Sequence, residues 1–334
     1  MKKFVVGVDA SKEKLDCCLL DSGAVAAEEQ LENSVSGVSR WLKAVQQAYG
    51  TAELLVCAEH GLYTYPLCRA CEEQGVVLWL ENPAQIKHCS GVQRGKSDRL
   101  DARKIALYAA RFSDRARPFS LPEKSIQTIR RPLSERDMYV TDRAKYRAQL
   151  SDQQRFMSKE DYKDKSKCLK ALVKKLDRAI VTVEVLLDAA IEENEQLSHQ
   201  RKLLCSVVGV GEKTAVKMIA ATNAFKDFDD PHKFCCHAGV APFAYCSGSS
   251  VRSQWKVSHR ADKSIKALPR MAALAAATKT KGELHEYYCG KVKEGKNKMS
   301  VLNAVRAKLV HRMFAVIRNN KMYQNSYSNQ LVLS

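Results

Sequence analysis

The feature that most constrains the fold is a pair of short apolar runs that each end in an acidic residue, at 4–9 and 54–59. Such runs of aliphatic residues are typical of strands that are buried on both faces of a sheet. Stretches with apolar residues at helical spacing follow them along the chain. We predict further strands at 17–20 and 76–80, and helices at 35–49, 62–74 and 96–111. This alternation predicts an α/β domain over residues 1–118, with a central and partly parallel sheet.

Four acidic residues of this domain occupy positions from which they can converge. Asp9 and Glu59 end the two strands. Asp98 and Asp101 stand three residues apart at the start of a helix, so both point to one face of it. Carboxylates packed together repel one another and do not all stay ionised without cations. Mg²⁺, with Mn²⁺ as a substitute, suits such a site, and two ions about 3.5–4 Å apart serve phosphoryl transfer. The four acids are therefore the predicted catalytic metal ligands of a ribonuclease-H-like nuclease core.

The charge of the chain is strongly positive and unevenly distributed. Lys and Arg number 55 against 37 Asp and Glu, which gives a net charge of +18. Residues 196–334 hold 23 of the basic and 8 of the acidic residues, whereas residues 1–195 hold 32 and 29. A basic half beside a near-neutral half predicts a polyanionic partner, with nucleic acid favoured over acidic lipid or a merely solubilising surface.

Composition and hydropathy exclude several classes of protein. No apolar run approaches the roughly 18–20 residues that a membrane span needs. The apolar stretch near the N-terminus stops at Asp9, too early for a secretion signal. The 12 cysteines include one Cys-x-x-Cys, at 68–71, without the second pair that a zinc site needs. We therefore expect reduced cysteines in a cytoplasmic, nucleoid-associated protein with no membrane partner.

The middle of the chain, residues 119–198, shows no convincing strand and predicts a helical, coiled-coil linker domain. Apolar residues recur there at alternating steps of three and four, which is a heptad seam. The seam consists of Leu169, Val173, Leu176, Ile180, Val183, Leu187 and Ala190. Two interpretations remain open, an antiparallel helical hairpin within one chain and a coiled coil that joins two chains.

A glycine-rich turn opens the third segment, residues 199–325, which we predict to be mainly helical; residues 326–334 form a tail. The turn at 207–214 lacks the Gly-Lys pair of a P-loop because Glu212 precedes the lysine. It is similar to a helix-hairpin-helix turn, in which glycines and a helix N-terminus approach a phosphate. A plain turn between helices is the alternative. The phosphate-binding candidates are Gly209, Gly211, Lys213, Thr214 and, further along, Arg252.

Six motifs together resemble one known family. Three lie in the α/β domain, at 7–16, 58–63 and 96–103. Three more lie in the C-terminal part, at 208–214, 238–242 and 247–252. In this order and at these spacings they resemble the DEDD transposases of the insertion-sequence "one-ten" family. These transposases are relatives of the Piv-type DNA invertases and of the RNA-guided "bridge" recombinases.

The resemblance implies an activity, a nucleophile and partners. It implies an N-terminal domain similar to the Holliday-junction resolvase fold, and a C-terminal transposase domain whose Ser247 attacks DNA and forms a phosphoserine link. It also implies a structured non-coding guide RNA that pairs with the DNA of the element ends and of the target. Assembly as a homo-oligomer, a dimer or a tetramer, follows from the same resemblance, with acids and serine drawn from different protomers.

Two other functions remain open at this stage. A junction-resolving nuclease of the same fold would use water activated by Mg²⁺, and Ser247 would then be incidental. A non-catalytic nucleic-acid-binding protein is the second alternative, and the presence of all four acids and of Ser247 argues against it.

Overall fold

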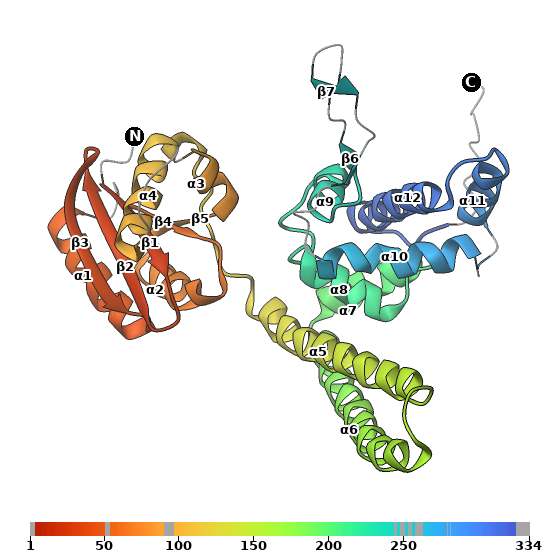
Figure 1. The fold of residues 1–334 in the computed structure, drawn as a ribbon. Helices are drawn as coiled ribbons and strands as arrows, with labels where there is room; N and C mark the ends of the chain where they lie inside the picture. The colour runs from red at the N-terminus through yellow and green to blue at the C-terminus, as the bar shows by residue number, and fades with distance from the viewer. Residues whose placement is uncertain are drawn as a thin grey trace, which may run out of the picture. The chain divides into compact units, whose positions relative to one another are not determined.

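The computed structural model describes residues 4–50, 54–89, 97–243, 246–247, 251–252, 256–257, 263–278, 280 and 282–324. The chain divides into two compact units, Met1–Leu121 and Pro122–Ser334 (Figure 1). Within the described ranges, no helix combines the length and the apolar character needed to cross a membrane.

The first unit is built on a five-stranded sheet in the order β3-β2-β1-β4-β5. Its strands are β1 (Phe4–Ala10), β2 (Lys14–Asp21), β3 (Ala24–Glu32), β4 (Leu54–Glu59) and β5 (Val77–Glu81). Strands β1, β4 and β5 are parallel, whereas β2 runs antiparallel to both of its neighbours. The predicted α/β domain with a partly parallel sheet is therefore confirmed.

The edge strand β3 is one of the elements that the sequence pattern did not reveal. Its residues are mostly exposed alanines and glutamates, because an edge strand has a face that no other element covers. A two-residue turn with positive φ at Ser22 and Gly23 joins it to β2, which is the backbone that a tight hairpin requires.

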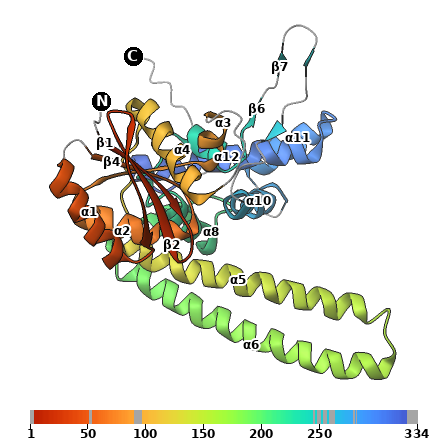
Figure 2. The same ribbon diagram turned by 60° about the vertical axis from the view of Figure 1, so that its left-hand side comes forward.

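Helices cover both faces of the sheet (Figures 1 and 2). They are α1 (Val35–Tyr49), the 3₁₀ turn η1 (Leu62–Thr64), α2 (Tyr65–Gln74), α3 (Pro83–Cys89), α4 (Asp98–Arg111) and the 3₁₀ turn η2 (Ser113–Arg115). Helices α1 and α2 pack into one apolar core, and α3 and α4 pack into the core on the opposite face. The sheet is thus the middle of three layers, and its strand ends are held between helices.

Helix α4 lies unusually close to β1. A Cβ atom added at Gly7 of β1 would stand 2.2 Å from the Ala106 nitrogen and 2.3 Å from the Ala102 oxygen. Only a glycine opposite small residues permits this approach of a helix backbone to a strand backbone. The contact fixes where the first turn of α4, which carries Asp98 and Asp101, lies relative to β1.

The second unit begins with a long antiparallel helical hairpin. Its helices α5 (Lys124–Gln153) and α6 (Lys159–Glu192) lie side by side (Figure 2). The heptad residues Leu169, Ile180, Val183 and Leu187 are buried in this unit. Much of the seam is therefore covered within the chain.

The rest of the second unit is a helical bundle with short strands. The helices are α7 (Glu195–Cys205), α8 (Glu212–Ala221), α9 (Pro231–His237), α10 (Lys263–Thr278), α11 (Glu283–Lys293) and α12 (Lys298–Asn319). Strand β6 (Pro242–Phe243) pairs with β9 (Lys256–Val257), and β7 (Cys246–Ser247) pairs with β8 (Val251–Arg252). One apolar core joins the ends of α5 and α6 to this bundle. The predicted helical content of the C-terminal part is confirmed.

The close contact at Gly7 leads to a first prediction. Gly7→Ala lowers the free energy of unfolding by about 2–3 kcal/mol, because the added methyl group meets backbone atoms that cannot move independently. Urea unfolding of the purified protein measures this loss. Gly61→Ala is the matched control, because that position has extended backbone and no atom closer than 3.9 Å to an added Cβ. Equal stability of the two variants would contradict the proposed role of the contact.

Candidate active site and nucleic-acid interface

The sheet brings the first two predicted acids together. Strands β1 and β4 are parallel, and Val8 pairs with Ala58 at the end of the ladder. Asp9 and Glu59 are the next residues on the two strands, so they leave the sheet side by side. Both side chains are only partly exposed. The carboxyl ends of two neighbouring strands therefore place two carboxylates at one edge, as the sequence pattern predicts.

The start of α4 supplies the other two acids. Ser97 caps the helix by accepting a hydrogen bond from the Leu100 N–H at 3.3 Å, and its carbonyl accepts one from the Asp101 N–H at 3.0 Å. Asp98 and Asp101 lie in the first turn. The positive end of the helix dipole favours carboxylates there.

Electrostatics show that the four acids act on one another. Burial raises the pKa of Asp9 from its ordinary value of 3.8 to about 6, with further contributions from the charges of Asp101, Asp98, Glu59 and Asp16. Burial and the charge of Asp101 also raise the pKa of Glu59, while Lys104 opposes this rise. The structure thus brings all four predicted acids into one electrostatic cluster within the first unit.

A fifth acid and two lysines belong to this cluster and were missed by the sequence analysis. Asp16 of β2 pairs in register with Asp9 and is buried, accepting a hydrogen bond from the Gln30 amide at 3.0 Å. The Lys14 ammonium lies 3.2 Å from the Asp16 carboxylate and 2.9 Å from that of Asp98. Lys104 and Asp101 approach to 2.6 Å. The strand register, which a sequence does not give, reveals Asp16 as a neighbour of Asp9. Lys104 stands three residues after Asp101 on α4, a spacing that the sequence analysis did not use.

The donor set fits a divalent cation, although the carboxylates do not converge closely. Among the residues that the structure describes, no three His, Cys, Asp or Glu side chains lie close enough together to hold a metal ion. Lys14 and Lys104 instead contact two of the acids. A partly buried acid whose pKa is raised by four other carboxylates is nevertheless a position that a cation relieves. Hard oxygen donors of this kind are those that Mg²⁺ prefers.

The predicted phosphate-binding turn lies between α7 and α8. Gly209 has a positive φ of 91°, and a Cβ added there would lie 2.7 Å from the Ala276 side chain and 2.9 Å from the Ala272 carbonyl. This glycine therefore lets the turn pack closely against α10. Gly211 precedes α8 with open space around it, and its carbonyl accepts a hydrogen bond from the Thr214 N–H at 2.9 Å.

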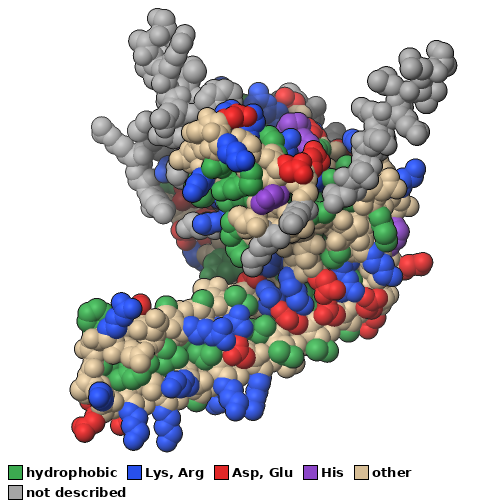
Figure 3. All heavy atoms as spheres, turned by 90° about the vertical axis from the view of Figure 1, so that its right-hand side faces the viewer, with side chains coloured by type: hydrophobic (Ala, Val, Ile, Leu, Met, Phe, Trp, Pro, Cys, Tyr) green, Lys and Arg blue, Asp and Glu red, His purple; other side chains and the backbone are tan. Residues whose placement is uncertain are grey.

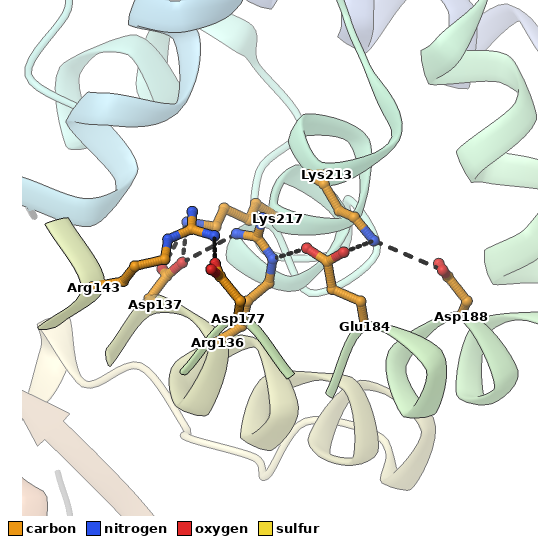
Figure 4. Close-up of polar contacts among 8 residues, drawn as sticks. All are labelled: Arg136, Asp137, Arg143, Asp177, Glu184, Asp188, Lys213 and Lys217. Carbon is orange, nitrogen blue, oxygen red and sulfur yellow. Dashed lines mark hydrogen bonds and ion pairs between the residues drawn. The ribbon is translucent and has the colours of Figure 1, made fainter. Parts of the chain in front are cut away.

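Lys213 is held by acidic side chains of the helical hairpin. Its ammonium lies 3.6 Å from the Glu184 carboxylate and 3.7 Å from that of Asp188, both on α6 (Figure 4). One turn further along α8, Lys217 pairs with Asp137 of α5 at 2.5 Å. Two lysines of α8 thus fasten this helix to the hairpin.

The hairpin has further ion pairs of its own beside this contact. Arg136 donates to Glu184 at 2.6 Å, and Arg143 donates to Asp177 at 2.8 Å, in each case from α5 to α6 (Figure 4). The pKa of Glu184 is lowered even though its burial opposes this, because Arg136 and Lys213 stabilise the carboxylate. The Glu184 carboxylate, which pairs with Lys213 of α8, is therefore charged at neutral pH.

The structure describes only the backbone of two predicted site residues. Ser247 lies in β7 and Arg252 in the neighbouring β8, where Cys246 pairs with Arg252 and Ser247 with Val251. Their side chains, and residues 248–250, lie outside the described part of the chain. The roles of both residues stay predictions.

Comparison with protein families gives two matches. A family model described as a transposase matches residues 6–158, and a second, described as the transposase IS116/IS110/IS902 family, matches residues 201–289. Together these matches cover well over half of the chain. The chain belongs to the IS116/IS110/IS902 family of transposases. The family that the sequence motifs resemble is thereby confirmed, and with it a transposase or recombinase activity on DNA.

Full-length relatives of the transposase are DNA-inverting proteins. The transposase is 22% identical to the pilin gene-inverting protein of Moraxella bovis over 336 aligned residues, and the match covers 97% of this chain and 98% of the relative. The pilin gene-inverting protein of Moraxella lacunata is 22% identical over 335 residues, with the same coverage.

Solved structures of a resolvase match part of the transposase. The RuvC of Thermus thermophilus in complex with a Holliday junction substrate is 16% identical, and the match covers 35% of this chain and 99% of that one with a TM-score of 0.30. A second Thermus thermophilus RuvC structure is 17% identical with a TM-score of 0.29. Family membership rests on the two family models and not on these likenesses.

The raised pKa of Asp9 gives a prediction with a definite sign. In the unfolded chain the carboxyl ionises near pH 3.8, and in the folded protein near pH 6. The folded state therefore binds the proton more tightly, and Asp9 reduces stability as pH rises through this window. Without metal, Asp9→Asn raises the free energy of unfolding at pH 7.5 by about 1–3 kcal/mol and has little effect at pH 3.5.

Thermal and urea unfolding at the two pH values measure this difference. Asp114→Asn is the matched control, because Asp114 is an exposed acid of the same unit. Mg²⁺ is expected to stabilise the wild type more than Asp9→Asn, because the variant lacks one of the proposed ligands. A variant that is less stable than the wild type at pH 7.5 would contradict the charge cluster.

Proposed function

We propose that the transposase cuts and rejoins DNA through a phosphoserine link at Ser247, with Mg²⁺ held by its four clustered acids. The observation that carries the metal-dependent part is that the pKa of Asp9 is raised by burial and by the charges of Asp101, Asp98 and Glu59. The choice of Ser247 rests on the family resemblance of residues 247–252. Bound Mg²⁺, for which Mn²⁺ can substitute, supplies positive charge that stabilises the oxygens of the transferring phosphoryl group.

In the proposed reaction the serine replaces a sugar oxygen on the phosphorus of the DNA backbone. The Ser247 Oγ forms a bond to a backbone phosphorus of DNA, and one P–O bond of the DNA backbone breaks. The serine proton passes to water, and the leaving oxygen takes up a proton to become a sugar hydroxyl. Rejoining is the reverse reaction with a different DNA end, so the energy of the broken phosphodiester is kept in the phosphoserine.

A structured non-coding guide RNA and more than one protomer complete the proposal. The net charge of residues 196–334, with 23 basic against 8 acidic residues, supports backbone contacts to both DNA and RNA. The outer face of α6 exposes Val181, Val185 and Leu186, each about 60% accessible. Hydrophobic side chains are also visible between Lys and Arg side chains along the hairpin (Figure 3). We infer that this face, rather than the covered seam, contacts a second copy of the chain in a dimer or tetramer.

A junction-resolving nuclease that uses activated water is the second candidate. One observation favours it, which is that the acid cluster is assembled within the first unit alone. In that case cleavage needs the acids but not Ser247. Membership of a transposase family disfavours the non-catalytic alternative.

A covalent adduct distinguishes the two candidates. With Mg²⁺, DNA carrying the element end and the target, and RNA from the flanking non-coding region, the wild type is expected to give a protease-sensitive shifted band on a denaturing gel. Ser247→Ala abolishes this band and leaves DNA binding intact. Ser249→Ala and Ser250→Ala are the matched controls and keep it. DNA cleavage without any shifted band, equal in wild type and Ser247→Ala, would establish the nuclease instead.

The lysines of α8 allow a test of the predicted phosphate-binding turn. If Gly211, Lys213 and Thr214 contact a phosphate, Lys213→Met lowers the slope of log affinity against log salt by about one. Lys217→Met is the matched control, because the Lys217 ammonium of the wild type also joins α8 to the hairpin, through its ion pair with Asp137. Fluorescence anisotropy with labelled duplex DNA measures both. Equal slopes for the two variants would show that Lys213 serves only to attach α8 to the hairpin.

A further inference from the structure

Arg306 of α12 is a buried cation with no partner among the described residues. Its side chain is only 7% exposed, and it shares the buried face of the helix with Leu302, Val305 and Leu309. Its Nε atom has no hydrogen-bond acceptor, and none of the ion pairs formed between described residues includes it. A guanidinium stays charged in proteins, so this is an uncompensated buried positive charge.

The other basic residues further along α12 are differently placed. Lys308 lies over the ring of Tyr287 at 4.8 Å, and Arg312 pairs with Glu283 at 2.5 Å. Arg318 is exposed to solvent. Each of these has an electrostatic partner or is open to water, whereas the side chain of Arg306 is mostly buried and has no hydrogen-bond or ion-pair partner among the described residues. The contrast indicates that the unpaired charge is specific to the position of Arg306 and is not a general property of α12.

The neighbouring charge that acts on Arg306 is a second cation. Arg270 lies on α10, which packs against α12. Burial and then the charge of Arg270 both lower the pKa of Arg306. Arg270 itself is exposed. Two guanidinium groups, one buried and one open to solvent, thus lie near each other, and no carboxylate of the described residues pairs with either of them. This is the charge arrangement of an anion site.

The position of Arg306 links it to the segment that carries Ser247. One turn earlier on α12, the Asn303 amide donates a hydrogen bond of 2.6 Å to the Val240 carbonyl. Val240 lies two residues before β6, β7 follows β6 along the chain, and Ser247 ends β7. The start of this strand segment is therefore tied to the turn of α12 that precedes the unpartnered guanidinium.

We propose that Arg306 and Arg270 form a binding site for a backbone phosphate of the DNA strand on which the transposase acts. The site rests on the proposed function in one respect, namely that DNA lies beside the segment of Ser247. A planar guanidinium binds two phosphate oxygens at once, and the DNA phosphate supplies the negative charge that no described residue provides there. Arg306 binds and orients the strand and takes no part in bond breaking.

Binding to a labelled DNA duplex that carries the element end, measured by fluorescence anisotropy over a range of salt, tests the site. Arg306→Met is expected to bind about tenfold more weakly at 0.1 M salt, with the salt slope lowered by about one. Arg270→Met is expected to show a similar loss. Arg318→Met is the matched control from the same helix and changes affinity about twofold at most. The melting temperature of Arg306→Met stays equal or rises, because an unpaired buried charge is removed.

Three outcomes would overturn the proposal. If Arg306→Met and Arg270→Met bind DNA with the same affinity as Arg318→Met, the two arginines do not form a phosphate site. An effect on binding of a single-stranded RNA of the same sequence, without an effect on DNA, would assign the site to RNA. If Arg306→Met does not fold, the exposed Arg270→Met decides, and normal DNA binding by it contradicts the proposal. Because binding is measured without divalent metal, the result does not depend on whether Ser247 attacks DNA.

Discussion

The close packing of α4 on β1 determines the geometry of the acid cluster. Gly7 has no side chain, and Ala102 and Ala106 face it, so that the helix backbone lies almost against the strand. The first turn of α4 is thereby held over the end of the same strand that carries Asp9. Two acids from strand ends and two from a helix terminus then share one region, and no loop has to position them. Rigid elements hold a constellation of charges more accurately than loops do.

This arrangement has an electrostatic cost that the protein compensates in part. Burial and four neighbouring carboxylates raise the pKa of Asp9 to about 6. Lys14 bridges Asp16 and Asp98, and Lys104 contacts Asp101, so that some of the negative charge is neutralised without metal. The second unit shows the opposite imbalance at Arg306, a mostly buried positive charge that pairs with no acid in the part of the chain that the structure describes. An excess of acids suits a metal cation, and an unpaired guanidinium suits a phosphate.

Much of the fold follows from local patterns in the sequence. The strands at 4–9 and 54–59 are continuous apolar runs, and the helix at 35–49 and the mostly helical second half have apolar residues at helical spacing. The structure confirms these elements. Strand β3 and helix α3 were not predicted, because β3 is an exposed edge strand and α3 has only seven residues. The heptad seam predicted contact between helices but not which helix would cover it. Much of it is covered by packing within the same unit.

The candidate site was predictable only where chain position alone indicates a role. Asp9, Glu59, Asp98 and Asp101 lie at strand ends and a helix start, and the structure brings them together. Asp16 and Lys14 join them through strand register and side-chain length, which no sequence pattern gives. Lys104 joins them at helical spacing from Asp101, a signal that the sequence does contain.

The central claim is that these acids hold catalytic divalent metal, and Mn²⁺ binding followed by electron paramagnetic resonance tests it most directly. We expect the wild type to bind Mn²⁺ and Mg²⁺ to displace it. Asp101→Asn is expected to lower the affinity for Mn²⁺ at least tenfold, which corresponds to about 1.4 kcal/mol or more of binding free energy. Binding of the same strength in Asp101→Asn, or none in the wild type, would contradict it.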